Sequence, residues 1–194
     1  MKILGGRLKG KNIYMPHGIR PTQNLIRKAV FDILGDVTGM KFLELFAGSG
    51  AVGLEAFSRG TQQVVLVEKE PFCVEVIEEN CKLLGIMPGG GPADPMQCFK
   101  GDVFATIKDL ACWGRKFDIV FFDPPYGRRL GKKALKTLSA HDIVHSHCFI
   151  IAQVKRDETL PKTEGRFFLV RERKYGASSL AIYKVREERV ESRE

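Results

Sequence analysis

The sequence predicts an α/β fold whose mostly parallel sheet carries helices on both faces. From Met40 onward, short apolar segments alternate with stretches of helical periodicity, which is typical of repeated βαβ units. The segment 117–122 is rich in apolar residues, as expected for a buried strand. In such a fold the carboxyl ends of the parallel strands meet at one edge, where ligands bind.

Composition places the chain among soluble globular proteins. It has 194 residues, of which 44% are hydrophobic and 28% charged, enough for one domain with a sizeable core. No apolar run reaches the roughly 20 residues of a membrane span, and the start lacks a signal-peptide core. We therefore expect a cytoplasmic protein that does not bind membranes, and base rates favour a monomer. The five cysteines form no C-x-x-C pair, so neither a disulfide framework nor a zinc site is expected.

The positive charge is concentrated at the start of the chain. The net charge is +8, and the residues up to Phe31 contribute seven basic side chains and no acid. Apolar residues are interspersed among these basic residues, which indicates folded structure rather than a solubilising tail. We predict that residues 1–36 form a basic extension that docks nucleic acid. Its candidate contacts are Arg7, Lys9, Lys11, Arg20 and Arg27.

Turn residues and periodicity predict a hairpin followed by a helix within this extension. Residues 2–15 alternate loosely around Gly5-Gly6 and Gly10, as in a hairpin with tight turns. A helix is expected between Thr22, its candidate N-cap, and Gly35, where it would end.

The remaining elements follow from short apolar runs and helical spacing. Strands are expected at 41–46, 64–68, 97–100, 117–122 and 148–154, and helices at 50–59, 71–84, 103–110 and 131–140. Two further strands, at 166–173 and 179–185, are expected to pair antiparallel at the sheet edge. These elements define a domain over 37–186, and the charged residues 187–194 form a tail.

The strand at 117–122 ends in Asp123-Pro124-Pro125-Tyr126, which we interpret as a catalytic site for an exocyclic amine. Such an amine is a poor nucleophile because its lone pair is delocalised into the ring. Hydrogen bonds from the NH2 group to the carboxylate of Asp123 and the carbonyl of Pro124 would localise that lone pair. The two prolines make a rigid turn, and Tyr126 would stack on the ring.

A glycine-rich turn predicts a cofactor site. Gly48-Ser49-Gly50 follows an expected strand and opens an expected helix, and Glu68 stands twenty residues after Gly48. This pattern satisfies the dinucleotide fingerprint, so an NAD-dependent oxidoreductase is one interpretation. S-adenosylmethionine requires the same arrangement, with its carboxylate at the helix N-terminus and its ribose at the acid. The second interpretation is favoured because little chain remains for a substrate domain. Asp102, after the third strand, is placed to accept a hydrogen bond from adenine, and a helix N-cap is its alternative role.

Taken together, these motifs resemble the RsmD family of bacterial 16S ribosomal RNA guanine-N2 methyltransferases. The resemblance covers roughly residues 1–185 and rests on Gly5-Gly6-Arg7, Arg20-Pro21-Thr22, Leu45-Phe46-Ala47-Gly48-Ser49-Gly50 and Asp123-Pro124-Pro125-Tyr126. It implies a class I S-adenosylmethionine-dependent methyltransferase (Rossmann-like) fold over 37–186, with a mostly parallel seven-stranded sheet. The implied partner is 16S ribosomal RNA or the assembling 30S subunit.

The resemblance also implies roles for individual residues. The cofactor would be bound by residues from the ends of three strands, namely Glu44, Phe46, Ala47, Gly48, Ser49, Gly50, Glu68, Lys69, Asp102 and Val103. Asp123, Pro124, Pro125 and Tyr126 would orient the guanine amine. No metal is implied.

Four positions depart from the family pattern. Glu44 stands where an Asp is usual, Leu25 and Lys28 replace an Arg and a Glu, and Gln153 occupies a strand end where an acid is common. None of these substitutions falls in the target-amine motif.

Other functions share parts of the pattern. An N6-adenine methyltransferase acting on RNA or DNA would use the same Asp-Pro-Pro-Tyr motif, because hydrogen bonding to an NH2 group is the same chemistry. A protein-glutamine methyltransferase more often has Asn at the position of Asp123. The histidines at 141, 145 and 147 are better explained by a polar helix–strand junction than by a metal site.

Overall fold

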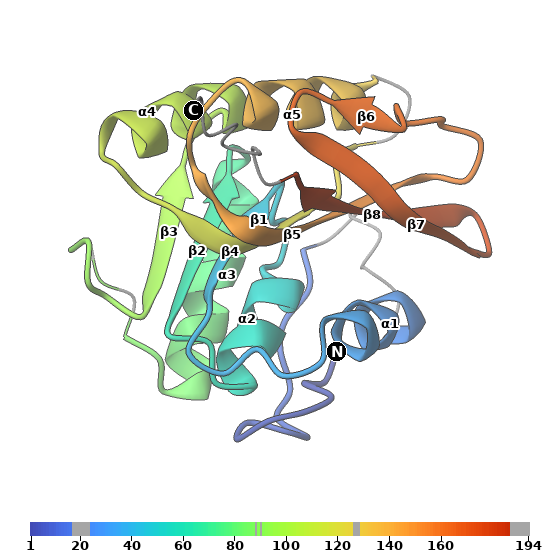
Figure 1. The fold of residues 1–194 in the computed structure, drawn as a ribbon. Helices are drawn as coiled ribbons and strands as arrows, with labels where there is room; N and C mark the ends of the chain where they lie inside the picture. The colour runs from blue at the N-terminus through green and yellow to red at the C-terminus, as the bar shows by residue number, and fades with distance from the viewer. Residues whose placement is uncertain (17–23, 88, 90, 126–128, 187–194) are drawn as a thin grey trace.

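The computed structural model describes residues 1–16, 24–87, 89, 91–125 and 129–186, and it contains one mixed sheet of eight strands. In spatial order the strands run β3-β2-β1-β4-β5-β8-β7-β6 (Figure 1). Their bounds are β1 Lys41–Leu45, β2 Gln63–Glu68, β3 Met96–Lys100, β4 Phe117–Phe122, β5 Val144–Lys155, β6 Thr163–Glu164, β7 Phe167–Tyr175 and β8 Ser178–Val185.

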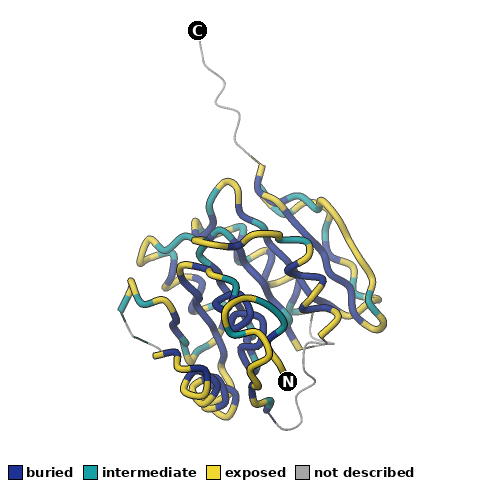
Figure 2. Tube along the Cα trace, turned by 90° about the horizontal axis from the view of Figure 1, so that it is seen from below, coloured by how far each residue is buried: buried dark blue, intermediate teal, exposed yellow. Residues whose placement is uncertain are grey.

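Five helices cover the two faces of the sheet. They are α1 Asn24–Leu34, α2 Ala51–Ser58, α3 Pro71–Leu84, α4 Val103–Cys112 and α5 Leu130–Ser139. Residues of α1, α2 and α3 share one buried cluster with one face of the sheet, and residues of α4 and α5 share another cluster with the opposite face (Figure 1). The central strands are therefore buried on both sides (Figure 2), which explains their nearly continuous apolar sequences.

The predicted elements agree closely with the observed ones, and the C-terminal hairpin adds one topological detail. β1 to β5 pair in parallel, whereas β8 is antiparallel to both β5 and β7. β7 therefore runs in the same direction as β1 to β5, with β8 inserted between it and β5. Local alternation correctly predicted an antiparallel pair, but it does not say which of the two strands joins the sheet.

Two expectations about the sheet need correction. The sheet has eight strands rather than seven, because Thr163 and Glu164 pair with Phe167 and Phe168 of β7. β5 also begins at Val144 instead of 148, because an irregularity in its pairing with β4 separates Val144 from Phe149. This irregular segment consists of polar residues, so a search for apolar runs does not detect it as part of a strand.

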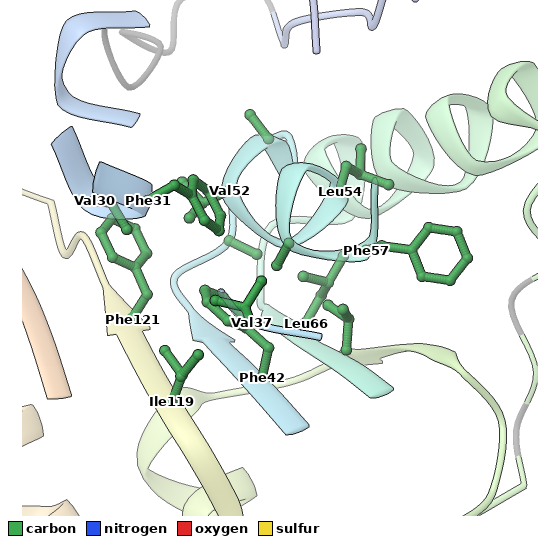
Figure 3. Packing of buried hydrophobic residues seen from close by; sticks show 14 of the residues in the cluster. Val30, Phe31, Val37, Phe42, Val52, Leu54, Phe57, Leu66, Ile119 and Phe121 are labelled. Carbon is green, nitrogen blue, oxygen red and sulfur yellow. The ribbon is translucent and has the colours of Figure 1, made fainter. Parts of the chain in front are cut away.

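Helix α2 packs unusually closely against β1 and β2. A Cβ atom on Gly53 would lie 2.4 Å from Leu66 of β2 and 2.8 Å from Glu44 of β1. Only glycine permits this approach. The neighbouring side chains of α2, including Val52 and Leu54, then pack in the same cluster as Phe42 and Leu66 (Figure 3).

The N-terminal segment, residues 1–16, packs on the C-terminal end of α2 instead of forming a separate arm. Ile3 and Ile13 are buried in the same cluster as α1 and α2. Arg7 N donates to the Ser58 carbonyl at 2.8 Å, which satisfies a helix-end acceptor. A Cβ atom on Gly6 would lie 1.9 Å from that same carbonyl oxygen. The Gly5-Gly6 pair is therefore explained by backbone contact with α2.

A buried carboxylate on α2 ties this segment to α1. Glu55 is fully buried and accepts a hydrogen bond from Leu4 N at 2.7 Å and from Arg59 Nε at 2.9 Å. Arg27 Nε of α1 lies 3.7 Å from the same carboxylate. Arg27 also donates to the sulfur of Met1 at 2.7 Å and to the Lys2 carbonyl. These contacts join three segments that are distant in sequence.

Within the described residues, no helix is long and apolar enough to cross a membrane.

Candidate functional site

Four strand ends meet at the carboxyl edge of the sheet, and each leads to a residue that the sequence analysis selected. β1 ends at Leu45 before the glycine turn, and β2 ends at Glu68. Asp102 follows β3, and Asp123 follows β4. Parallel pairing in the order β3-β2-β1-β4 brings these four ends side by side. We refer to this set of strand ends as the carboxyl-edge site.

The turn between β1 and α2 has a left-handed backbone at three positions. Phe46 has φ 57°, Gly48 has φ 55° and Gly50 has φ 70°. Phe46 is unusual because residues with a Cβ atom rarely adopt this conformation. Ala47 N donates to the Val67 carbonyl at 3.1 Å, which fixes the turn to β2. A Cβ atom on Gly48 would meet nothing within 4 Å, so the turn has open space above it.

Glu68 closes this turn from the neighbouring strand. Its Oε2 accepts a hydrogen bond from Gly48 N at 2.7 Å. Its Oε1 accepts from Lys69 N at 2.8 Å and from Glu70 N at 2.9 Å. Glu68 thus binds both the backbone of the glycine turn and the backbone that follows β2. Lys69 beside it is exposed.

Glu44 caps helix α2 from within the sheet. Gly50, the N-cap residue, has no side chain to accept from the first turn of the helix. Glu44 Oε2 supplies an acceptor instead, at 2.7 Å from Gly53 N. Burial raises the pKa of Glu44 to about 8. Hydrogen bonds from α2 oppose this rise, and the charges of Asp123 and Glu68 add to it.

The end of β3 shows the N-cap role that was considered for Asp102, and its binding of adenine stays a prediction. Its Oδ1 caps α4 by accepting from Phe104 N at 2.9 Å and Ala105 N at 3.1 Å. The residue is nevertheless exposed, whereas Val103 beside it is buried. The Phe104 ring packs edge-on against Phe46, with 6.2 Å between ring centroids.

The target-amine motif begins where β4 leaves the sheet. Asp123 is partly exposed, Pro124 is buried and Pro125 is exposed. Asp123 belongs to the same electrostatic cluster as Glu44 and Glu68, since the charges of Asp123 and Glu68 both raise the pKa of Glu44. Tyr126, the fourth residue of the motif, lies outside the described residues.

The basic residues chosen as RNA contacts divide into three groups. Arg7, Lys9 and Lys11 are exposed, and the Arg7 guanidinium also lies over the Phe57 ring at 4.3 Å. Arg20 lies outside the described residues. Arg27 requires correction, because its side chain is 0% exposed and its contacts are those that join the N-terminal segment to α1 and α2. These contacts occupy the guanidinium within the protein, so Arg27 is not available to RNA.

One residue near the glycine turn was missed by the sequence analysis. Asn80 of α3 is fully buried and donates to the Ser49 carbonyl at 3.3 Å. The same amide accepts from Tyr14 N at 2.6 Å and donates to the Tyr14 carbonyl at 3.1 Å. Asn80 therefore holds the end of the N-terminal segment against the glycine turn. A polar residue at an apolar helix position was the available signal.

His145 and His147 lie far from this site, at the opposite edge of the sheet. His147 Nε2 lies 2.7 Å from Asp118 Oδ1, near the start of β4, and its ring stacks on His145. Among the described residues no group of three or more His, Cys, Asp or Glu side chains is arranged to bind a metal.

Comparison with known proteins identifies the family. The family model described as Conserved hypothetical protein 95 matches residues 1–184. Ribosomal RNA small subunit methyltransferase D of Escherichia coli K12 is 29% identical over 186 residues, covering 94% of this chain and 89% of that relative. The chain belongs to the RsmD family. The resemblance inferred from the motifs is thereby confirmed.

Solved structures agree with this assignment at the level of the fold. A hypothetical protein of Thermus thermophilus has a TM-score of 0.82 and 32% identity, covering 95% of this chain and 99% of its own. An RNA methyltransferase from Salinibacter ruber, solved with S-adenosyl-L-homocysteine, has a TM-score of 0.65 at 18% identity. It covers 87% of this chain and 95% of its own. The RsmD-family chain therefore has an α/β methyltransferase fold.

The raised pKa of Glu44 predicts a pH dependence of stability. Between the ordinary value of 4.5 and about 8, the folded protein holds a proton that the unfolded chain releases. The free energy of unfolding therefore falls as pH rises through this range. Between pH 5.5 and 7.5, the free energy of unfolding of wild type should fall by about 2 kcal/mol more than that of Glu44→Gln.

Urea unfolding of both proteins at the two pH values measures this difference. Glu78→Gln, which changes an exposed residue of α3, is the matched control and should follow wild type. Parallel pH profiles for Glu44→Gln and wild type would contradict the assignment.

Proposed function

We propose that this protein transfers a methyl group from S-adenosylmethionine to the exocyclic N2 amine of a guanine in 16S ribosomal RNA. The observation that carries the proposal is the position of Asp123 at the end of β4, beside the strand whose end forms the glycine turn. One edge of the sheet thus has a place for a methyl donor and an acceptor group for an amine. Names of relatives such as ribosomal RNA small subunit methyltransferase D support the choice of substrate.

The residues of the glycine turn fit S-adenosylmethionine. The carboxylate of the methionine part would lie in the open space above Gly48, at the N-terminal end of α2. Glu44 lies at the same helix end, where it would face the amine of that part. Glu68 and Lys69 at the end of β2 would bind the ribose, and Asp102 with Val103 would bind adenine. When bound, this cofactor supplies an electrophilic methyl group on a sulfonium.

The protein then contributes orientation and electrostatics. Asp123 and the Pro124 carbonyl would accept hydrogen bonds from the NH2 group and localise its lone pair. The negative charge of Asp123 would stabilise the positive charge that develops on the amine nitrogen. Pro125 has a restricted backbone at its own position. Tyr126 is proposed to stack on the base, as the motif suggests.

Two other functions use the same residues differently. An N6-adenine methyltransferase needs the same hydrogen bonds to an NH2 group, so it remains the second candidate. An NAD-dependent oxidoreductase would use the glycine turn and Glu68, but it leaves Asp123 and its two prolines without a role.

Asp123→Ala should abolish methyl transfer and leave the dissociation constant for S-adenosylmethionine within a few-fold of wild type. The reason is that Asp123 serves the acceptor amine, whereas donor binding depends on the ends of β1, β2 and β3. Labelled methyl transfer to 16S RNA and calorimetric binding of the cofactor measure the two quantities separately. Asp109→Ala, on the exposed side of α4, is the control. Equal losses of transfer and binding would refute this division of roles.

The N-terminal segment is proposed to contact RNA through Lys9 and Lys11. Reversing both to Glu should weaken binding of 16S RNA and reduce the slope of log affinity against log salt by about two. Arg7 is left unchanged because its packing on Phe57 is structural. Lys108 and Lys136, exposed on α4 and α5, provide a control reversal with the same change in net charge. Equal effects of the two double variants would count against a specific docking role.

A further inference from the structure

One buried polar group at the end of β5 lacks a hydrogen-bond donor within the described part of the chain. Gln153 of β5 is 4% exposed, and its Oε1 accepts no hydrogen bond from any residue in the described part of the chain. A buried acceptor without a donor is costly to the folded state, and an apolar side chain of similar size would avoid the cost. Such groups require an explanation in a native structure.

The register of the sheet places Gln153 beside Asp123. In the parallel pairing of β4 with β5, Phe121 lies opposite Ile151 and Phe122 opposite Ala152. Asp123 follows Phe122 and Gln153 follows Ala152, so the two residues stand one position beyond the last printed pair of these neighbouring strands. Phe121 and Ile151 belong to the buried cluster on the α1–α3 face. Because side chains alternate along strands, Gln153 points to that same face.

The cross-strand partner of Gln153 and its strand neighbours on the same face are apolar. Its cross-strand partner on β8 is Leu180, which is fully buried. Ile151, Leu180 and Ile182 belong to the same buried cluster. These neighbours have no side-chain donors, so the packing of the sheet does not account for the amide.

We propose that Gln153 is a specificity-determining residue that accepts a hydrogen bond from N1–H of the target guanine. This inference rests on the proposed function. Guanine presents two adjacent donors on its base-pairing edge, N1–H and the N2 amine. Asp123 and Gln153 present two adjacent acceptors, a carboxylate oxygen and an amide oxygen. The pair therefore matches guanine along the edge that carries the reacting amine.

Adenine does not match the same pair of acceptors. Its N6 amine would reach Asp123, but the neighbouring N1 atom is an acceptor and would face the Gln153 oxygen. A buried acceptor would then remain unpaired, and sites of this kind discriminate strongly against the wrong partner. Gln153 thus supplies a structural reason for choosing guanine N2 over adenine N6, which the Asp123 motif alone does not provide.

2-Aminopurine tests this inference with the wild-type enzyme. It carries the same amine at C2 but has no hydrogen on N1. A 16S RNA with guanosine or 2-aminopurine riboside at the mapped target position provides the two substrates. We expect kcat/KM to be at least about tenfold higher for guanosine, the effect of one hydrogen bond and an unpaired buried acceptor.

Two variants of Gln153 assign the preference to this residue. Gln153→Leu removes the acceptor and should bring the guanosine to 2-aminopurine ratio close to one. Gln153→Glu has only acceptor oxygens and should preserve the preference for guanosine. Each result is the ratio of kcat/KM for two substrates on one protein, so a general loss of stability does not produce the same change.

The results that would overturn the inference differ from the result that would overturn the proposed function. An equal rate on both substrates in wild type, or an unchanged ratio in Gln153→Leu, would overturn the inference while the proposed function stands. Loss of the guanosine preference in Gln153→Glu would also overturn it, because the amide nitrogen would then be the group in use. Failure of wild type to methylate N2 of any guanine would overturn both the inference and the proposed function.

Discussion

The close approach of α2 to β1 and β2 is the constraint on which the carboxyl-edge site depends. Gly53 has no room for a side chain between the helix and the sheet, and Glu44 binds the first turn of the helix from β1. The glycine turn between β1 and α2 is therefore fixed at both ends. Its left-handed residues and the hydrogen bond from Gly48 to Glu68 follow from that position.

The same helix also organises the start of the chain. Its C-terminal end receives the Gly5-Gly6 turn, and Glu55 in its middle binds the backbone of Leu4. An eight-residue helix is about 12 Å long, so Arg7 at its C-terminal end lies about one helix length from the glycine turn. RNA that contacts both would have to extend along the α1–α2 side of the molecule. The N-terminal segment is therefore part of the core through Ile3 and Ile13, while its basic residues Lys9 and Lys11 remain exposed.

Most of the fold and the strand-end site could be predicted because both depend on local signals. Apolar runs and helical spacing located the elements, and the acid or glycine after each strand located Glu68, Asp102 and Asp123. Contacts between segments that are distant in the sequence have no local signal from which they could be predicted. Arg27 was placed outward because of its charge, but a buried carboxylate on α2 holds it inside. The insertion of β8 beside β5, the capping of α2 by Glu44 and the unpaired oxygen of Gln153 likewise depend on tertiary neighbours.

The central claim is that the amine held at Asp123 is N2 of guanine in 16S ribosomal RNA. The most direct test is labelled methyl transfer from S-adenosylmethionine to 30S particles or 16S RNA from cells lacking the endogenous enzyme. The RNA is then digested to nucleosides and the labelled product identified. We expect N2-methylguanosine as the labelled nucleoside. Labelled N6-methyladenosine, or no labelled nucleoside, would contradict it.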